Sequence, residues 1–184
     1  MTQIKINYKY EVMLLLLKKQ MHVREIQKKL KTSLTRIQSV LKELRKINVI
    51  DYTVEGKNHI YFIKKNLHSK AVIINAENYK LLKILNKHPE FEPIFRDIID
   101  KSKCSLIILF GSYAKGTDKK NSDIDIYIDT TNLKIKHEIQ KIYDLLSIKI
   151  GKFNLDSLLI KEIKKNHVII KGAEEFYEKL KFFE

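Results

Sequence analysis

Two short motifs in the second half of the chain combine residue types that could bind a nucleotide and a metal ion. Gly111 and Ser112 follow the apolar run LIILF, and ten residues separate Ser112 from the motif Asp123-Ile124-Asp125. Side chains two apart on a strand share a face, so Asp123 and Asp125 would project together. Paired carboxylates repel each other unless a cation compensates them, and Mg²⁺ held by carboxylates and substrate phosphates is a common arrangement. We therefore expect a Mg²⁺ site here, which Mn²⁺ could also occupy.

The first motif supplies groups that suit a triphosphate. Gly111, at the end of a buried strand, would let the backbone approach the phosphates closely, and Ser112 would offer a hydroxyl beside backbone N–H groups. Lys115 would compensate phosphate charge. Gly-Ser pairs are common in turns, and Asp-x-Asp occurs by chance at strand edges. It is their spacing, between two predicted strands, that indicates one shared site.

The stretch FGSYAKG at residues 110–116, with SDIDI at 122–126, resembles the signature of the DNA polymerase β-type nucleotidyltransferase superfamily. The Ala-Lys-Gly and Ser-Asp-apolar-Asp details look most like the minimal nucleotidyltransferases, and the resemblance covers about residues 90–184. It implies that Asp123 and Asp125, with a third acid, bind Mg²⁺ and act in catalysis. The implied reaction moves a nucleoside monophosphate from ATP or another NTP, AMP being the first expectation, to an acceptor hydroxyl.

Asp156 is the expected third carboxylate. It lies in the run NLDSLL, within a strand predicted over 153–160, where an unpaired Asp is costly. Its position matches the third catalytic Asp of the superfamily, which implies that it binds metal and positions or deprotonates the attacking hydroxyl. The alternative is an Asp that faces water at a strand edge, and His167 is expected to be structural rather than a nucleotide contact. Weaker candidates for the third acid are Asp118, Asp129 and Asp144.

Around these motifs the apolar pattern predicts an α+β domain. Continuous or alternating apolar residues predict strands at 106–110, 124–128 and 153–160, and helical spacing predicts helices at 93–101, 135–148 and 174–182. We expect a small mixed sheet flanked by helices.

The first third of the chain has a different pattern. Predicted helices over 8–19, 23–30 and 34–47 precede a β-hairpin of 50–54 and 60–63 around Gly56. Over residues 6–66 this order resembles the winged helix-turn-helix group. The resemblance implies binding of duplex DNA by the polar face of the third helix, whose start Ser33 would cap, and by the wing. The alternative is a protein-interaction module. The residues expected to contact DNA are Thr35, Arg36, Gln38, Ser39, Lys42 and Lys57.

Charge and composition agree with an anionic partner. The formal net charge is +14, of which +10 falls in residues 1–66. A general richness in Lys, Ile and Asn is the alternative explanation. A single cysteine excludes an intramolecular disulfide, and the apolar run Val12–Leu17 is too short to span a bilayer. With no signal-peptide pattern, we expect a cytoplasmic protein without a membrane partner.

The sequence thus predicts a winged helix domain at 1–68, a helical connector at 69–88 and a nucleotidyltransferase domain at 89–184. No further domain for gripping a long primer-template is evident, which favours a small-molecule or protein acceptor over polymerisation. Resemblance to the minimal nucleotidyltransferases implies one concrete acceptor, a partner toxin that the protein would adenylylate as its antitoxin. The alternative function is a DNA-binding transcriptional regulator whose nucleotidyltransferase domain only senses nucleotide.

Overall fold

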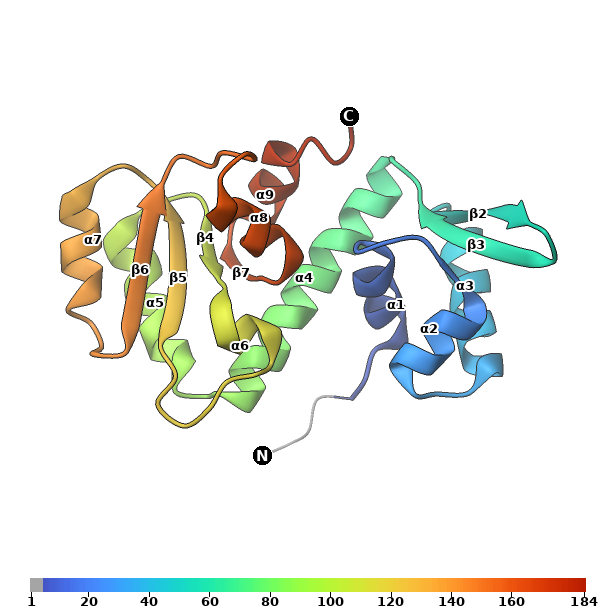
Figure 1. The fold of residues 1–184 in the computed structure, drawn as a ribbon, viewed down its shortest axis with the longest axis horizontal. Helices are drawn as coiled ribbons and strands as arrows, with labels where there is room; N and C mark the ends of the chain where they lie inside the picture. Colours follow the sequence, from blue (N-terminus) through green and yellow to red (C-terminus); the bar gives the residue numbers. More distant parts are fainter. Residues whose placement is uncertain (1–4) are drawn as a thin grey trace. The chain divides into compact units, whose positions relative to one another are not determined.

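The computed structural model describes residues 5–184, and their contacts form two compact units that share one long helix (Figure 1). Among the described residues, one unit is Lys80–Phe182, and the other is residues 5–79 together with Phe183–Glu184. The division falls inside α4 (Leu67–Lys87). Both units combine helices with a small sheet, so the α+β prediction is confirmed. Within the described residues, no helix is long and apolar enough to cross a membrane.

The N-terminal unit contains the three predicted helices and the predicted hairpin. Its helices are α1 (Tyr8–Leu16), α2 (Val23–Leu30) and α3 (Leu34–Lys46), and the hairpin strands are β2 (Ile50–Glu55) and β3 (Asn58–Ile63). Ser33 caps α3 as predicted, because its hydroxyl accepts the Arg36 amide at 3.3 Å. The two-residue strand β1 (Met21–His22), which pairs with β3, was too short to be predicted. The assignment of this unit to the winged helix group stays a prediction.

The second unit is built on a four-stranded sheet with the order β6-β5-β4-β7 (Figure 1). Strand β4 runs antiparallel to both β5 and β7, whereas β5 runs parallel to β6, so the sheet is mixed as predicted. The strands are β4 (Ile107–Leu109), β5 (Ile124–Asp129), β6 (Leu146–Gly151) and β7 (Val168–Lys171).

One face of this sheet is covered by α5 (Phe91–Ser102) and α7 (Leu133–Gln140), which enclose the core of the unit. Ile124, Ile126 and Ile128 of β5 are fully buried in that core. Asp125 lies between the first two and therefore projects from the opposite face of the sheet. The remaining helices are α6 (Gly111–Lys115), α8 (Leu158–Lys165) and α9 (Ala173–Lys179).

The helix predicted over 135–148 is wrong in its second half. Helix α7 ends at Gln140, and the chain then enters β6, the strand beside β5 at one edge of the sheet. Leu146 and Ile148 are buried while Lys149 is exposed, so the segment follows the two-residue period of a strand that is covered on one side.

The strand predicted over 153–160 is also wrong. Residues from Leu158 onward form α8, in which Ile160 and Ile163 are the buried residues, and this spacing of three is helical. Strand β7 was not predicted at all, although its residues Val168 and Ile170 pack into the core. These corrections change the surroundings of the site, because β6 and not a later strand lies next to β5.

Candidate active site

The centre of the site is a close contact between Gly111 and Asp125. Gly111 starts α6, is separated from the end of β4 by Phe110, and has a φ of 68°, a conformation that favours glycine. A Cβ atom at this position would lie 2.0 Å from Oδ2 of Asp125. The preceding amide, that of Phe110, donates a hydrogen bond to the Asp125 carbonyl at 2.9 Å. The two sequence motifs are therefore joined in space, and only glycine leaves room for the carboxylate.

Asp125 has an environment that opposes its negative charge. Burial raises the pKa of its carboxyl, and the nearby carboxylates of Asp123 and Glu162 raise it further, whereas a hydrogen bond with Ser147 and the charge of Lys149 lower it. Ser147 stands opposite Asp125 in the parallel register of β5 and β6. A half-buried carboxylate that is next to another acid is stabilised by a cation.

The oxygen donors at this point suit a hard divalent cation. Asp123, exposed directly before β5, and Asp125 supply two carboxylates, and Gly111 leaves the space beside Asp125 free of side-chain atoms. Mg²⁺ binds through one or two carboxylates together with substrate phosphates, so the donor set fits Mg²⁺. Across residues 5–184, no three His, Cys, Asp or Glu side chains are grouped so that they could hold one metal ion.

The two other residues predicted to bind nucleotide lie on α6. Ser112 is half-buried, and its carbonyl accepts the Thr117 amide at 3.0 Å. Lys115 is exposed and pairs with Glu162 of α8, with 2.7 Å between Nζ and Oε1. Because both side chains of this pair are about two-fifths exposed, 40% and 44%, the ion pair holds Lys115 only weakly. A triphosphate could therefore compete for the ammonium group.

Asp156 does not lie on a strand. The structure places it, exposed, in the turn between β6 and α8, where its amide donates to Oδ1 of Asn154 at 3.0 Å. The strand predicted over 153–160 does not form, because the strand beside β5 is β6, which ends at Gly151, five residues before Asp156. The acid from this part of the chain whose charge raises the pKa of Asp125 is Glu162.

The weaker candidates have other surroundings. Asp129, at the end of β5, forms an ion pair with Lys179 at 3.0 Å and accepts the Phe153 amide at 3.0 Å, which is a structural arrangement. Asp144 lies exposed in the turn before β6, not on a helix face. His167 contacts the Ile163 carbonyl through Nδ1 at 2.8 Å, and its ring packs 4.6 Å from that of Phe176.

Sequence reasoning missed three residues that shift the pKa of Asp125, namely Ser147 through a hydrogen bond and Lys149 and Glu162 through their charges. The alternation of apolar and polar residues over 146–150 was the signal that could have placed the first two on a strand. No local signal places Glu162 there, because its position depends on how α8 packs.

The residues predicted to contact DNA lie in the N-terminal unit and are all exposed. On α3, Ile37, Leu41 and Leu44 are fully buried, so the polar face of this helix is turned outward. Lys57 lies at the hairpin turn between β2 and β3. A cavity of about 470 Å³ is lined by His22, Val23, Arg24, Gln38, Lys57, Asn58, His59 and Tyr61.

Comparison with known proteins identifies the family of the second unit. Residues 92–181 match the family described as "Polymerase beta, Nucleotidyltransferase". Two proteins of Methanocaldococcus jannaschii, named "Putative protein adenylyltransferase MJ1217" and "Putative protein adenylyltransferase MJ0126", are 33% and 32% identical to this chain over 91 residues. That alignment spans 47% of this chain and 87% of each relative. The chain therefore belongs to the polymerase beta nucleotidyltransferase family, and the predicted resemblance is confirmed.

A solved structure described as "Crystal structure of the toxin-antitoxin with AMP-PNP" is also similar. It is 25% identical, and the match covers 58% of this chain and 86% of that chain with a TM-score of 0.34. A TM-score this low supports no inference about the fold or the partners of this protein.

Proposed function

We propose that the protein transfers AMP from ATP to a hydroxyl group of another protein, with Mg²⁺ held by Asp123 and Asp125. The observation that carries this proposal is the contact of Gly111 with Asp125, which joins the Gly-Ser motif to the acidic pair. A protein acceptor is supported by the two relatives, which are named as protein adenylyltransferases. Family membership supports nucleotidyl transfer as the reaction class.

In this reaction the acceptor oxygen forms a bond to the α-phosphorus of ATP. The bond from that phosphorus to the oxygen that bridges the α- and β-phosphates breaks, and pyrophosphate leaves with the bonding electrons. When bound, Mg²⁺ or Mn²⁺ would neutralise charge on the phosphate oxygens. Lys115 would exchange Glu162 for a phosphate oxygen, and Ser112 would donate its hydroxyl hydrogen bond to the triphosphate. Asp156 would accept the proton of the acceptor hydroxyl.

The position of the label in ATP distinguishes this reaction from others. We expect purified full-length protein to pass radioactivity from ATP labelled at the α-phosphate, and not at the γ-phosphate, to a protein of its host lysate. Asp123→Asn and Asp125→Asn should abolish transfer, because they remove the charge that holds Mg²⁺ while nearly keeping side-chain size. Asp100→Asn, at an exposed position of α5, is the matched control and should transfer normally.

Three results would contradict the proposal. Full transfer by both Asp→Asn variants would exclude the acidic pair, and label from the γ-phosphate would indicate a kinase. Absence of transfer under all conditions, with nucleotide still bound, would favour the regulator that only senses nucleotide. Mass spectrometry of the labelled band would identify the acceptor protein. In its most specific form, the proposal names a partner toxin as that acceptor.

We also propose that the N-terminal unit binds duplex DNA. Its support is the exposed polar face of α3 and the cavity beside it, whose charged lining residues, among those described, are the cations Arg24 and Lys57. Phosphate contacts release condensed counterions, so affinity of the full-length protein for duplex DNA should fall steeply as salt rises. Arg24→Ala combined with Lys57→Ala should reduce that salt dependence, and absence of a mobility shift at low salt would favour a protein-interaction role.

A further inference from the structure

The segment that leads from α6 to β5 is a closed loop that ends at Asp123. At its start, the Thr117 amide donates to the Ser112 carbonyl at 3.0 Å. Near its end, Ser122 and Lys119 are joined twice, by the Lys119 amide on Oγ of Ser122 at 2.9 Å and by the Ser122 amide on the Lys119 carbonyl at 3.0 Å. Since Asp123 directly follows Ser122, the position of this loop determines where Asp123 enters the site.

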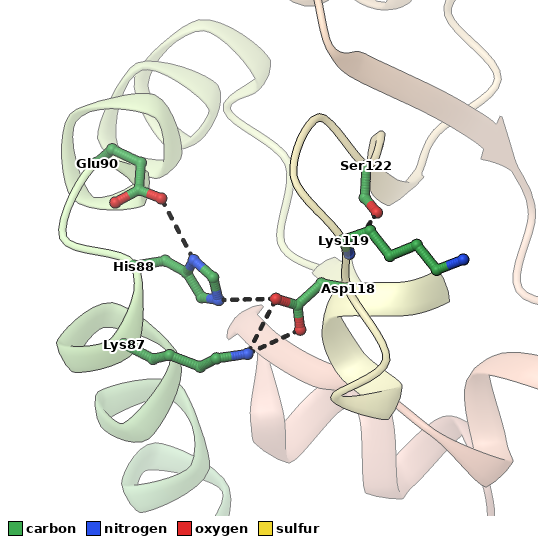
Figure 2. A network of polar contacts seen from close by, with 6 residues as sticks. All are labelled: Lys87, His88, Glu90, Asp118, Lys119 and Ser122. Carbon is green, nitrogen blue, oxygen red and sulfur yellow. Dashed lines mark hydrogen bonds and ion pairs between the residues drawn. The ribbon is translucent and has the colours of Figure 1, made fainter.

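A single side chain, Asp118, ties this loop to the end of α4 (Figure 2). Nζ of Lys87 lies 2.8 Å from one carboxylate oxygen of Asp118 and 2.9 Å from the other. The Asp118 side chain is only 11% exposed, and its hydrogen bond with Lys87 is the main cause of its lowered pKa. The Lys87 side chain is 54% exposed, so the ion pair by itself is weak, but the Asp118 carboxylate is held at both oxygens by Lys87 and also lies beside His88, whose side chain is only 14% exposed. Contacts from two neighbouring residues on one largely buried carboxylate restrict the loop more than a single exposed ion pair does.

His88 contacts Asp118 of the same loop and Glu90 (Figure 2), and its ring also packs against two aromatic side chains. Its ring stacks on Phe91 with 4.9 Å between centroids and meets the Tyr113 ring edge-on at 5.0 Å. Its Nε2 lies 3.5 Å from Oδ2 of Asp118, and its Nδ1 lies 3.3 Å from Oε1 of Glu90. Tyr113 belongs to α6 and is next to Ser112. His88 therefore contacts both the helix α6, through Tyr113, and the loop that follows it, through Asp118.

We propose that Lys87 and Asp118 are positioning residues for nucleotidyl transfer, which hold the loop of residues 117–122 so that Asp123 lies beside Asp125. This inference rests on the proposed function, and it adds residues outside the signature. Neither residue would touch the nucleotide. Their loss should therefore lower the rate of the chemical step more than it weakens nucleotide binding.

The test compares substitutions that remove the ion pair with one that keeps it. Lys87→Met and Asp118→Asn remove the ion pair. Lys87→Arg keeps the positive charge and can still donate hydrogen bonds to both carboxylate oxygens of Asp118. Lys101→Met, which removes an exposed lysine from α5, is the matched control. Amide exchange of residues 117–122 is measured first in the full-length protein without nucleotide. Single-turnover AMP transfer and equilibrium binding of a non-hydrolysable ATP analogue are measured next.

We expect faster exchange of the loop and a transfer rate lowered about 10- to 100-fold in Lys87→Met and Asp118→Asn, the scale of a misplacement of about 1 Å. Analogue affinity should change less than threefold, and Lys87→Arg should restore both the exchange and the rate. Unchanged exchange, an unchanged rate, or equal losses of rate and affinity would overturn the proposal. Amide exchange is measured without nucleotide, so it does not depend on the transfer reaction. If the loop of the wild-type protein is protected from exchange but the wild-type protein transfers no AMP, the proposed function is overturned instead.

Discussion

The contact between Gly111 and Asp125 makes a specific prediction for Gly111→Ala. The new Cβ would lie 2.0 Å from Oδ2 and 2.9 Å from Cγ of Asp125, both shorter than an ordinary contact of 3.4 Å or more. The carboxylate must therefore move by more than about 1 Å, a misplacement that can lower a reaction rate about 100-fold. We expect Gly111→Ala to lower single-turnover AMP transfer by about that factor.

Gly116→Ala is the control for the backbone cost of this change. Gly116 ends α6 with a φ of 71°, close to the 68° of Gly111, but a Cβ there meets nothing within 4 Å. Alanine in this left-handed conformation costs about 1–2 kcal/mol in either variant. For a unit of this size, each kcal/mol lowers the melting temperature by about 4–8 °C, so both variants should melt earlier.

The assay compares the two variants in transfer rate and in melting temperature. We expect a melting temperature lowered in both and a rate lowered about 100-fold in Gly111→Ala alone, because only that Cβ displaces the carboxylate. Equal transfer rates in the two variants, at saturating ATP and Mg²⁺, would refute the reasoning that Gly111 makes room for Asp125.

Three further predictions concern the same site. Because burial raises the pKa of the Asp125 carboxyl in the protein without metal, protonation should compete with Mg²⁺ at mildly acid pH, so affinity for Mg²⁺ measured without nucleotide should begin to fall at a higher pH than the ordinary Asp pKa of about 4; an affinity that falls only at that ordinary value would contradict the assignment. Ser112→Ala with Lys115→Ala should weaken NTP binding by about 1–3 kcal/mol, and unchanged affinity by calorimetry would count against the triphosphate contact. Asp156→Asn should lower single-turnover transfer about 10²–10⁴-fold with little change in analogue binding, as expected for a general base. Should Glu162→Gln show that loss instead, the proton acceptor is the acid on α8.

Much of the site was predictable because its determinants are local in sequence. The motifs with Ser112 and Asp123 were predicted to form one site between two strands, and the structure contains both strands, with α6 between them. The alternation of Ile124, Asp125 and Ile126 predicted which side of β5 is buried. The segment after residue 140 was not predictable in the same way, since its apolar residues fit both a helical and a strand period over a short range.

By itself, the sequence determined that Asp125 projects from the side of β5 opposite to its buried isoleucines, because side-chain direction along a strand depends only on its period. That Asp123, which lies directly before β5, projects to the same side stays a prediction. The tertiary structure alone decided that β6 lies beside β5, which brings Ser147 opposite Asp125. It also decided that Glu162 pairs with Lys115 and raises the pKa of Asp125 through its charge, and that Asp156 lies in a turn. Such contacts join residues from separate elements, and they depend on strand order, register and helix packing, which no local pattern specifies.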